Sequence, residues 1–384
     1  MPLFIHTADW QIGRQYSQFA ADDAVPIADA RIDAVATLAR LATDQRADAV
    51  LVAGDVFDAQ TVSDKTIRRL FNAMGGFAGP WILIPGNHDA ALAESVWTRA
   101  QRLGAVAANV HLSLQPETLV FASAGFAVLT APLTQRHTYN DLTTWFDSAE
   151  TPDGLLRIGM AHGAVQGILA PDIDSANPIA PDRTERARLD YLALGDWHGC
   201  KQIDARTWYS GTPETDRFRA NEPGFALRVQ IDAPGAPPQV APIPIGRYRW
   251  SQSVHALAVA SDADAVVARL AALDDSDVAQ ISLQGETDLH SLERIKAALS
   301  QAEARARSLS VDFDALRLLP TDEDILALNA DGYLGDVIAT LRDRQGGAQP
   351  QVATQALALL TTLLAERRAA GNGGGGMATQ SATA

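Results

Sequence analysis

Five short apolar runs in the sequence each lead directly into polar residues with metal-binding side chains. The runs are rich in Ile, Leu and Val, which favour β-strands, and amphipathic helical patterns separate the first three of them. This alternation of strands and helices is typical of a layered α/β fold. The strands that we predict are Leu3–Thr7, Ala49–Ala53, Trp81–Ile84, Leu155–Ala161 and Tyr191–Leu194, with a sixth strand at Phe126–Thr130.

The polar residues that follow these strands make a coherent set of metal ligands. In an α/β sheet the carboxyl ends of the strands lie along one edge, where ligands bind, so we expect the set to come together there. Carboxylate, amide and imidazole groups suit Mn, Fe or Zn, whereas a thiolate cluster is excluded because Cys200 is the single cysteine. The candidate residues are Asp9, Asp55, Asn87, His88, His162, Asp196 and His198.

The composition limits the location and the partners of the chain. One cysteine allows no intrachain disulfide, the first residues lack the basic start of a signal peptide, and no apolar run reaches the ~20 residues of a membrane span. We therefore expect a cytoplasmic protein that does not enter a membrane. The formal net charge is −15, from 46 acidic and 31 basic residues. This balance disfavours a free-standing nucleic-acid binder, although bound cations or a partner subunit could supply positive charge.

Patterns beyond the motifs predict further parts of the chain. The runs Phe225–Ile231 and Val240–Ile245 are expected to form a second sheet that closes a main domain. Alternating strand and helix patterns then predict a small α/β domain, and two apolar stripes predict helices after it. A Gly- and Thr-rich tail is expected to be disordered. The boundaries are 1–250 for the main domain, 251–320 for the small α/β domain, 321–370 for the helical segment and 371–384 for the tail.

The motifs, taken in order, resemble those of the calcineurin-like metallophosphoesterase superfamily. They read Asp9-Trp-Gln11, Gly54-Asp-Val-Phe-Asp58, Gly86-Asn-His-Asp89, His162-Gly163 and Gly195-Asp-Trp-His-Gly199. The flanking residues and the segment Tyr209-Ser-Gly-Thr-Pro-Glu214 narrow the resemblance to SbcD-like DNA-repair exonucleases. Five motifs in order are much more specific than any one of them. The resemblance covers residues 1 to about 250, and it implies a four-layered α/β/β/α fold with the small α/β domain as a cap.

The resemblance implies a role for each member of the ligand set. Asp55 would bridge two divalent metals, Asp9 and His198 would complete one metal site, and Asn87 and His162 would belong to the other. Two metals about 3.5–4 Å apart stabilise both the attacking and the leaving oxygen of a phosphoester. No serine or cysteine nucleophile is then needed.

Other residues are expected to act on the substrate or to vary the metal site. His88 would stabilise the transition state or protonate the leaving oxygen, and Arg14 would contact a phosphate. Gln11 and Asp196 stand where the family usually has histidine ligands, and Asp58 replaces a histidine of several family nucleases. We keep Gln11 and Asp196 as metal ligands, and a carboxylate in place of an imidazole favours Mn over Zn.

These roles predict a two-metal-dependent phosphodiester hydrolase. The specific expectation is an exonuclease that acts on DNA during repair, with endonuclease activity as an additional activity. The expected cofactors are two divalent metal ions, Mn first, with Fe, Zn or Mg as alternatives. By the resemblance, the C-terminal helices would bind an SbcC-like SMC-type ATPase, and a homodimer is a further option. Two alternatives stay open. One is a phosphodiesterase or phosphatase for nucleotides or other small phosphoesters, which the acidic charge favours. The other is a scaffold that has lost a metal through Gln11 and Asp196.

Some residues near the motifs have two interpretations, and others are expected to have a structural role without taking part in catalysis. Trp10 and Trp197, which flank the unusual ligands, suit either stacking on an unpaired base or core packing. The C-terminal apolar stripes suit either packing within their own domain or docking of a partner. We interpret His6 as a core histidine and Asp89 as a loop-capping group.

Overall fold

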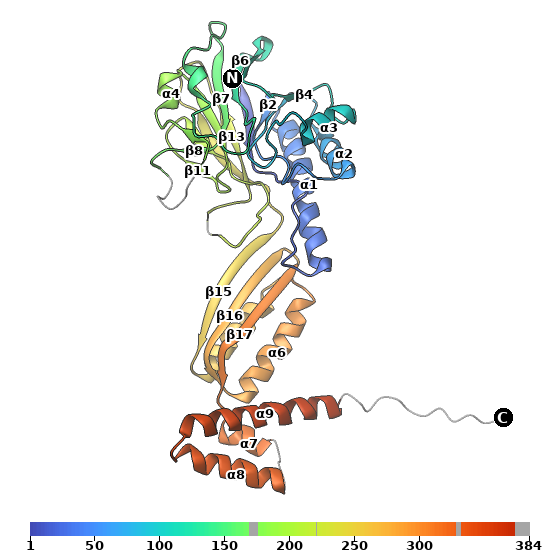
Figure 1. Cartoon of the computed structure of the whole chain (residues 1–384), viewed down its shortest axis with the longest axis vertical. Coiled ribbons are helices and arrows are strands. Elements are labelled where there is room, and N and C mark those ends of the chain that lie inside the picture. The colour runs from blue at the N-terminus through green and yellow to red at the C-terminus, as the bar shows by residue number, and fades with distance from the viewer. Residues whose placement is uncertain (169–175, 220, 328–331, 373–384) are drawn as a thin grey trace, which may run out of the picture. The chain divides into compact units, whose positions relative to one another are not determined.

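The computed structural model describes residues 1–168, 176–219, 221–327 and 332–372. The chain divides into two compact units, Met1–Arg249 and Trp250–Ala384. All of the candidate site residues lie in the first unit, several of whose strands and helices are labelled in Figure 1.

One sheet of the first unit has the strands of the first three motifs at its centre. β1 pairs in parallel with β2, and β2 pairs in parallel with β3, so their carboxyl ends reach the same edge. All three strands are buried along their whole length, as expected for strands that are covered on both faces. In sheet order the strands are β14 (Gln239–Pro244), β13 (Phe225–Gln230), β1 (Leu3–Thr7), β2 (Ala49–Ala53), β3 (Trp81–Ile84) and β4 (Val110–Leu112).

The strands after residue 225 belong to this first sheet. β13 pairs antiparallel with β1 from Leu3 to His6, and β14 pairs antiparallel with β13. The prediction that 225–231 and 240–245 form a second sheet is therefore wrong. β13 fills the edge of β1 that β2 leaves open, and its buried residues Leu227 and Val229 join the apolar layer behind β1.

A second sheet carries the last two motifs. β10 pairs in parallel with β7, and their register places Gly195 opposite His162 at the carboxyl ends. The motifs therefore meet between the edges of two stacked sheets, and not along one edge as the sequence suggested. In sheet order the strands are β11 (Lys201–Gln202), β12 (Thr207–Tyr209), β10 (Tyr191–Gly195), β7 (Leu156–His162), β6 (Phe126–Ala131) and β5 (Glu117–Phe121).

Three apolar layers separate four structural layers in the first unit. Residues such as Leu38 and Leu70 pack helices on the outer face of the first sheet. Phe4 and Ile158 belong to the layer between the sheets, and Phe146 and Leu189 cover the outer face of the second sheet. The predicted α/β/β/α fold is confirmed. The helices on the first sheet are α1 (Ala21–Asp44), α2 (Asp64–Ala73) and α3 (Val96–Arg102), and the helical turns on the second are η3 (Thr144–Asp147) and α4 (Arg183–Arg186).

Local sequence signals start two of the helices on the first sheet. The side chain of Ser63 accepts a hydrogen bond from the backbone of Thr66 and caps α2. Ser95 and Thr98 form a capping box at the start of α3. The remaining short elements of the unit are η1 (Met74–Gly76), η2 (Ala122–Ala124), β8 (Ala164–Val165) and β9 (Pro178–Ile179).

The second unit begins with a three-stranded sheet that is covered by two helices. β16 is the middle strand and pairs in parallel with β17. Leu270 of α5 and Ile295 of α6 share a buried cluster with Ile281 of β16, so the helices cover one face of the sheet. In chain order the elements are β15 (Arg249–Leu257), α5 (Ala260–Ala271), β16 (Asp277–Thr287), α6 (Leu289–Glu303) and β17 (Ser308–Leu318).

Three helices follow: α7 (Asp322–Ala327), α8 (Tyr333–Gln345) and α9 (Pro350–Asn372). Ile325, Ile338 and Leu357 form their small common core. The part of the predicted tail beyond Asn372 lies outside the described residues. Within the described ranges, no helix combines the length and the apolar content that a bilayer crossing needs.

Candidate metal centre

The loops after β1 and β2 run side by side and carry the first candidate ligands. The backbone N–H of Asp9 donates to the carbonyl of Gly54 at 3.0 Å, and that of Gln11 donates to the carbonyl of Asp55 at 2.9 Å. Asp9, Gln11 and Asp55 all have positive φ angles, of 54°, 43° and 52°. Such backbone conformations cost free energy in residues other than glycine, and they concentrate at functional sites.

His162, at the end of β7, reaches across to these loops from the second sheet. Its Nδ1 donates to the carbonyl oxygen of Ala53 at 2.8 Å, which fixes the ring with Nε2 directed into the site. Gly54 has a φ of +93°, and a Cβ atom there would lie 2.3 Å from Nδ1 of His162. A glycine at this position is therefore needed for the imidazole to approach the loop.

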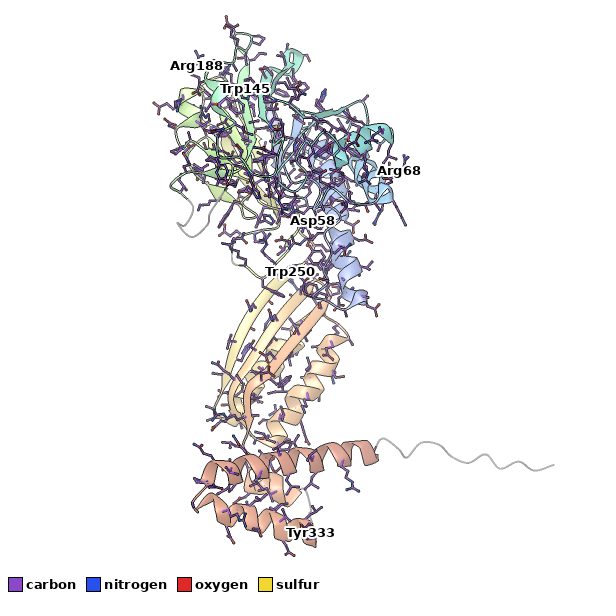
Figure 2. All side chains as sticks on the ribbon, viewed as in Figure 1. Asp58, Arg68, Trp145, Arg188, Trp250 and Tyr333 are labelled. Carbon is purple, nitrogen blue, oxygen red and sulfur yellow. The ribbon has the colours of Figure 1, made fainter. Side chains whose placement is uncertain are left out.

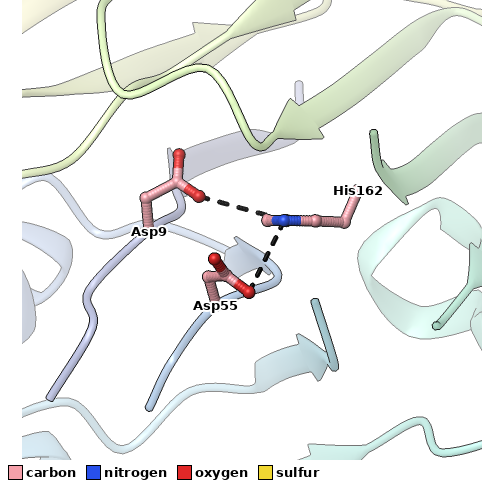
Figure 3. A group of neighbouring side chains, drawn as sticks. All are labelled: Asp9, Asp55 and His162. Carbon is pink, nitrogen blue, oxygen red and sulfur yellow. Dashed lines mark ion pairs between the residues drawn. The ribbon is translucent and has the colours of Figure 1, made fainter. Parts of the chain in front are cut away.

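Asp9, Asp55 and His162 form a compact buried cluster, drawn in Figure 3. One potential ligand atom of each residue lies within 4.8 Å of those of the other two. Nε2 of His162 is 3.6 Å from Oδ1 of Asp55, and Nδ1 is 4.0 Å from Oδ1 of Asp9. Burial raises the pKa of Asp9. Burial would lower the pKa of His162, but the carboxylates of Asp55, Asp9 and Asp196 raise it to about 9.

Asn87 and Asp196 extend this cluster on either side of His162. Oδ1 of Asn87 lies 2.9 Å from Nε2 of His162, and Oδ1 of Asp196 lies 3.7 Å from the same atom. The backbone N–H of Asp196 donates to both carboxylate oxygens of Asp9, at 3.1 and 3.3 Å. Burial raises the pKa of Asp196 to about 6. Four oxygen-bearing side chains thus surround one imidazole ring.

His198 faces Gln11 on the other side of the site. Nε2 of His198 lies 3.3 Å from Nε2 of Gln11, and Oε1 of Gln11 accepts a hydrogen bond from Arg14 at 2.7 Å. In this arrangement the amide oxygen of Gln11 is directed to Arg14. Arg14 also lies 3.7 Å from the carboxylate of Asp58, which is labelled in Figure 2.

His88 lies beside Asp55. Its backbone N–H donates to Oδ1 of Asp55 at 2.9 Å, and its Nδ1 donates to the carbonyl of Asp58 at 2.8 Å. The remaining ring nitrogen, Nε2, is 3.9 Å from Oδ2 of Asp55. The backbone thus fixes the imidazole ring, and Nε2 remains available for proton transfer.

A cavity of about 500 Å³ is lined by several candidate residues, although Asp9, Asp55 and His162 are not among its lining residues. Its volume is that of a site for a small organic ligand. Metal-capable side chains line one part of it and three arginines line another. The lining residues are Gln11, Arg14, Asn87, His88, His137, Ala176, Asn177, Asp196, Trp197, His198, Arg217, Arg219 and Asn221.

Comparison with known families agrees with the motifs and the fold. A family model described as calcineurin-like phosphoesterase matches residues 2–227. The chain belongs to this family.

Two named relatives are nucleases or repair proteins. The DNA double-strand break repair protein Mre11 of Methanosarcina acetivorans is 26% identical over 233 residues, which are 57% of this chain and 35% of that protein. The SbcD component of the SbcCD nuclease of Rhodobacter capsulatus is 37% identical over 92 residues, 23% of this chain and 21% of that protein. The chain therefore spans about a third and a fifth of the lengths of these relatives.

A crystal structure of a protein from Thermus thermophilus aligns with a TM-score of 0.40 and 10% identity, over 63% of this chain and 98% of that one. At that score the likeness does not bear on the fold.

Calcineurin-like phosphoesterases bind divalent metals and hydrolyse phosphoesters, and the side chains of this family member fit such ions. Asp9 and Asp55 are 0% and 2% exposed, and buried carboxylates need a compensating positive charge. These carboxylates raise the pKa of His162 to about 9, so a proton on its ring would supply part of that charge. A divalent cation among the same oxygen and nitrogen donors would supply it more fully, and these donors suit Mn, Fe and Zn.

The structure also shows residues of this phosphoesterase that the sequence did not single out. Nη2 of Arg217 lies 2.8 Å from Nδ1 of His198, and the same nitrogen lies 3.0 Å from a carboxylate oxygen of Asp216. Burial opposes its ionisation, but the hydrogen bond from His198 and the nearby arginines hold the pKa of Asp216 far below its usual range. Arg31, buried in α1, donates to the backbone carbonyls of Asp9 and Trp10. The segment Tyr209–Glu214, noted for its resemblance, ends two residues before Asp216 and was the available signal.

Other residues near the motifs have structural positions. Trp10 is buried and packs edge-on against Trp81, so it does not stack on a base. Asp89 accepts hydrogen bonds from the backbone of Gly86 and Phe57, as a loop-capping group does. His137, which lies outside every motif, lines the cavity.

Proposed function

We propose that this protein is a two-metal-dependent phosphodiester hydrolase that acts as an exonuclease on DNA during repair, with endonuclease activity as an extension. The observation that carries the proposal is the buried cluster of Asp9, Asp55 and His162 beside a cavity that is lined by further donors and by arginines. In this proposal Asp55 would be shared by two ions. Asp9, Gln11 and His198 would help to hold one of them, and Asn87, His162 and Asp196 would complete the set.

Bound divalent ions would supply Lewis-acid stabilisation of the phosphate and a water molecule of lowered pKa. The protein's own groups do the remaining work. Nδ1 of His88 is hydrogen-bonded to the carbonyl of Asp58, so Nε2 is the atom that would donate a proton to the leaving oxygen. Arg14 lines the same cavity and would contact a phosphate oxygen.

Mn is the proposed ion, with Fe, Zn or Mg as alternatives. The donor set is rich in carboxylate and amide oxygens and has two histidines, a balance that suits Mn better than a purely nitrogen or sulfur site would. Asp196, at the position of a usual histidine, moves the balance further toward oxygen.

DNA is the proposed substrate because the two named relatives are a nuclease component and a DNA-break repair protein. The cavity supports a polyanionic substrate, since Arg14, Arg217 and Arg219 line it although the chain has a net charge of −15. A phosphodiesterase for nucleotides or other small phosphoesters is the second candidate, and that net charge favours it.

The proposed partner is an SbcC-like SMC-type ATPase, bound by the C-terminal helices. One relative is a named component of the SbcCD nuclease. On α9, Val352, Leu359 and Leu363 are 59%, 65% and 60% exposed in the chain by itself, which is unusual for large apolar side chains on one helix. We expect Leu359→Glu to weaken co-elution with the purified ATPase, whereas Gln355→Glu on the same helix would not. Self-association lost in Leu359→Glu would instead indicate a homodimer.

The function is tested by Mn-dependent cleavage of end-labelled single- and double-stranded DNA, beside hydrolysis of bis-p-nitrophenyl phosphate. Progressive shortening of DNA that is lost in His88→Ala supports the exonuclease. Hydrolysis of the small diester alone supports the phosphodiesterase, or a nuclease that needs the ATPase to present DNA. If neither substrate is hydrolysed and fewer than two metals bind per chain, the result would indicate a non-catalytic scaffold.

A further inference from the structure

The arginines of the cavity beyond Arg14 come from one segment, residues 217–219 and 221, which lies beside the loop of Asp196 and His198. Arg217, Arg219 and Asn221 of this segment line the cavity together with the two candidate ligands. The cavity of about 500 Å³ holds more than a single phosphate group. Positive side chains at its wall are therefore placed to contact a part of the substrate beyond the reacting phosphate.

The arginines differ in how much of their charge is already neutralised. Arg217 pairs with the buried carboxylate of Asp216 at 2.8 Å, and Arg14 lies 3.5 Å from the same carboxylate. Within the part of the chain that the structure describes, no carboxylate lies in ion-pairing distance of Arg219. The guanidinium of Arg219 instead lies 5.1 Å from the ring centre of Trp197. Arg219 is thus the arginine whose charge remains available to a ligand.

Trp197 contacts Arg219 and belongs to the loop that carries two candidate ligands. It stands between Asp196 and His198 in the sequence, and its ring also receives Lys201 at 5.2 Å. The indole ring therefore makes cation–π contacts with two cations, of which Arg219 lines the cavity. This arrangement places positive charge beside the ligand loop without a carboxylate to cancel that of Arg219.

The segment that carries Arg219 is fixed to the ligand loop by its backbone. The N–H of Cys200 donates to the carbonyl of Glu222 at 3.0 Å, and the N–H of Thr212 donates to the carbonyl of His198 at 3.1 Å. A Cβ atom on Gly199 would lie 1.7 Å from the carbonyl oxygen of Asn221, so this contact requires glycine. The backbone before and after Arg219 is thus anchored to the ligand loop in the protein without substrate, and such preorganisation lowers the entropic cost of binding.

We propose that Arg219, supported by Trp197, forms a second phosphate subsite that binds the phosphate adjacent to the one at the metal centre. The subsite gives the site a preference for a single strand with at least two consecutive phosphodiesters over an isolated phosphoester. It rests on the proposed function, because it assigns a substrate feature to the same site.

Equilibrium binding of a fluorescein-labelled hexathymidylate in Ca²⁺, followed by anisotropy at several salt concentrations, tests the subsite without hydrolysis. Each phosphate contact to a single strand contributes about 0.7 to the slope of log K against log salt. Arg219→Gln should reduce the slope by about that amount and weaken binding about tenfold at low salt, as expected for one charge-assisted hydrogen bond. Arg219→Lys should keep the slope, because it keeps the charge.

Arg40→Gln is the matched control, since Arg40 is exposed on α1 and bonds to the neighbouring Thr37. It changes the net charge equally and should leave both the slope and the affinity as in the wild type. An unchanged slope in Arg219→Gln, or an equal change in Arg40→Gln, overturns the subsite. If the wild type does not bind the hexamer at low salt, the subsite is also refuted, while hydrolysis of bis-p-nitrophenyl phosphate would still support a phosphodiesterase.

Discussion

Nδ1 of His198 lies 3.0 Å from a carboxylate oxygen of Asp216, and the same nitrogen lies 2.8 Å from Nη2 of Arg217. Asp216 is 1% exposed. A carboxylate at one ring nitrogen fixes the tautomer and the orientation of a histidine, so that the other nitrogen presents its lone pair. In this protein that other nitrogen is Nε2, which faces Gln11 across the proposed metal site.

Replacement of Asp216 should therefore weaken metal binding without removing a ligand. We expect Asp216→Asn to lower the affinity for Mn about 10–100-fold, the usual effect of losing a carboxylate behind a ligating histidine. The measurement is a titration of free Mn by electron paramagnetic resonance. Asp33→Asn, on the exposed face of α1, is the control for lost charge. An unchanged affinity in a folded Asp216→Asn protein would show that this carboxylate does not position His198.

Gly54 should not tolerate a side chain. Its φ of +93° and the 2.3 Å distance from a Cβ atom to Nδ1 of His162 predict that Gly54→Ala displaces the imidazole. The expected cost is about 1–3 kcal/mol in the free energy of unfolding, together with a loss of Mn affinity, measured by urea denaturation and metal titration. At Gly75 a Cβ atom meets nothing within 4 Å. Gly75→Ala should leave both quantities near the wild-type values, and equal effects of the two substitutions would contradict the steric argument.

His6 should make the stability depend on pH. It lies between the sheets, with Nδ1 2.9 Å from the hydroxyl of Tyr191 and Nε2 3.2 Å from the carbonyl of Leu194. Burial lowers its pKa from 6.5 to about 3, although the bond to Leu194 opposes the shift. The folded protein therefore keeps the ring neutral, whereas the unfolded chain takes up a proton as the pH falls through 6.5. The stability that His6 contributes is complete above that pH and is lost as the pH falls toward 3.

Comparison of the wild type with His6→Gln isolates this effect from that of buried carboxylates such as Asp89 and Asp196, whose raised pKa values act in the opposite direction. As the pH falls from about 7 to about 5, the free energy of unfolding of the wild type should decrease by about 2 kcal/mol relative to that of His6→Gln. A difference that stays constant over this range would show that His6 is not buried as a neutral ring.

Arg31 should be irreplaceable by lysine. Its guanidinium donates to the carbonyls of Asp9, Trp10 and Glu214 and to the hydroxyls of Tyr16 and Thr212. Lysine keeps the charge but cannot make this fork of hydrogen bonds, so Arg31→Lys should destabilise the protein by about 3 kcal/mol or more. Arg40→Lys is the matched control. Similar melting temperatures of the two variants would contradict the role of Arg31.

The sequence predicted the strands of the ligand set well because their signals are local. β1, β2 and β3 are continuous buried runs, and each ends at a motif, so their bounds agree with the prediction. The pairing of β13 with β1 could not be predicted in the same way. It joins residues that are far apart along the chain, such as Leu3 and Gln230, and neither strand's pattern specifies its neighbour.

The residues that support the ligands were missed for a similar reason. Arg31 lies in the middle of a helix, where an arginine normally faces solvent, and only the tertiary structure buries it against the loop of Asp9. Asp216 follows His198 only after two intervening strands, β11 and β12, and the chain must fold back before the two side chains meet. Trp10 has the chemistry of a stacking residue, and its burial against Trp81 follows from the path of its loop.

The proposed site has Asp55 as a ligand shared by two metal ions. The number of Mn ions bound per chain at equilibrium tests this most directly. Two ions per chain are expected in the wild type, and Asp55→Asn should lose or greatly weaken both, because it removes charge and a ligand from both positions. Asp58→Asn, a little further along the same loop, should retain both ions. Binding of one ion or none by the wild type, or two ions in Asp55→Asn with unchanged affinity, would contradict a two-metal centre bridged by Asp55.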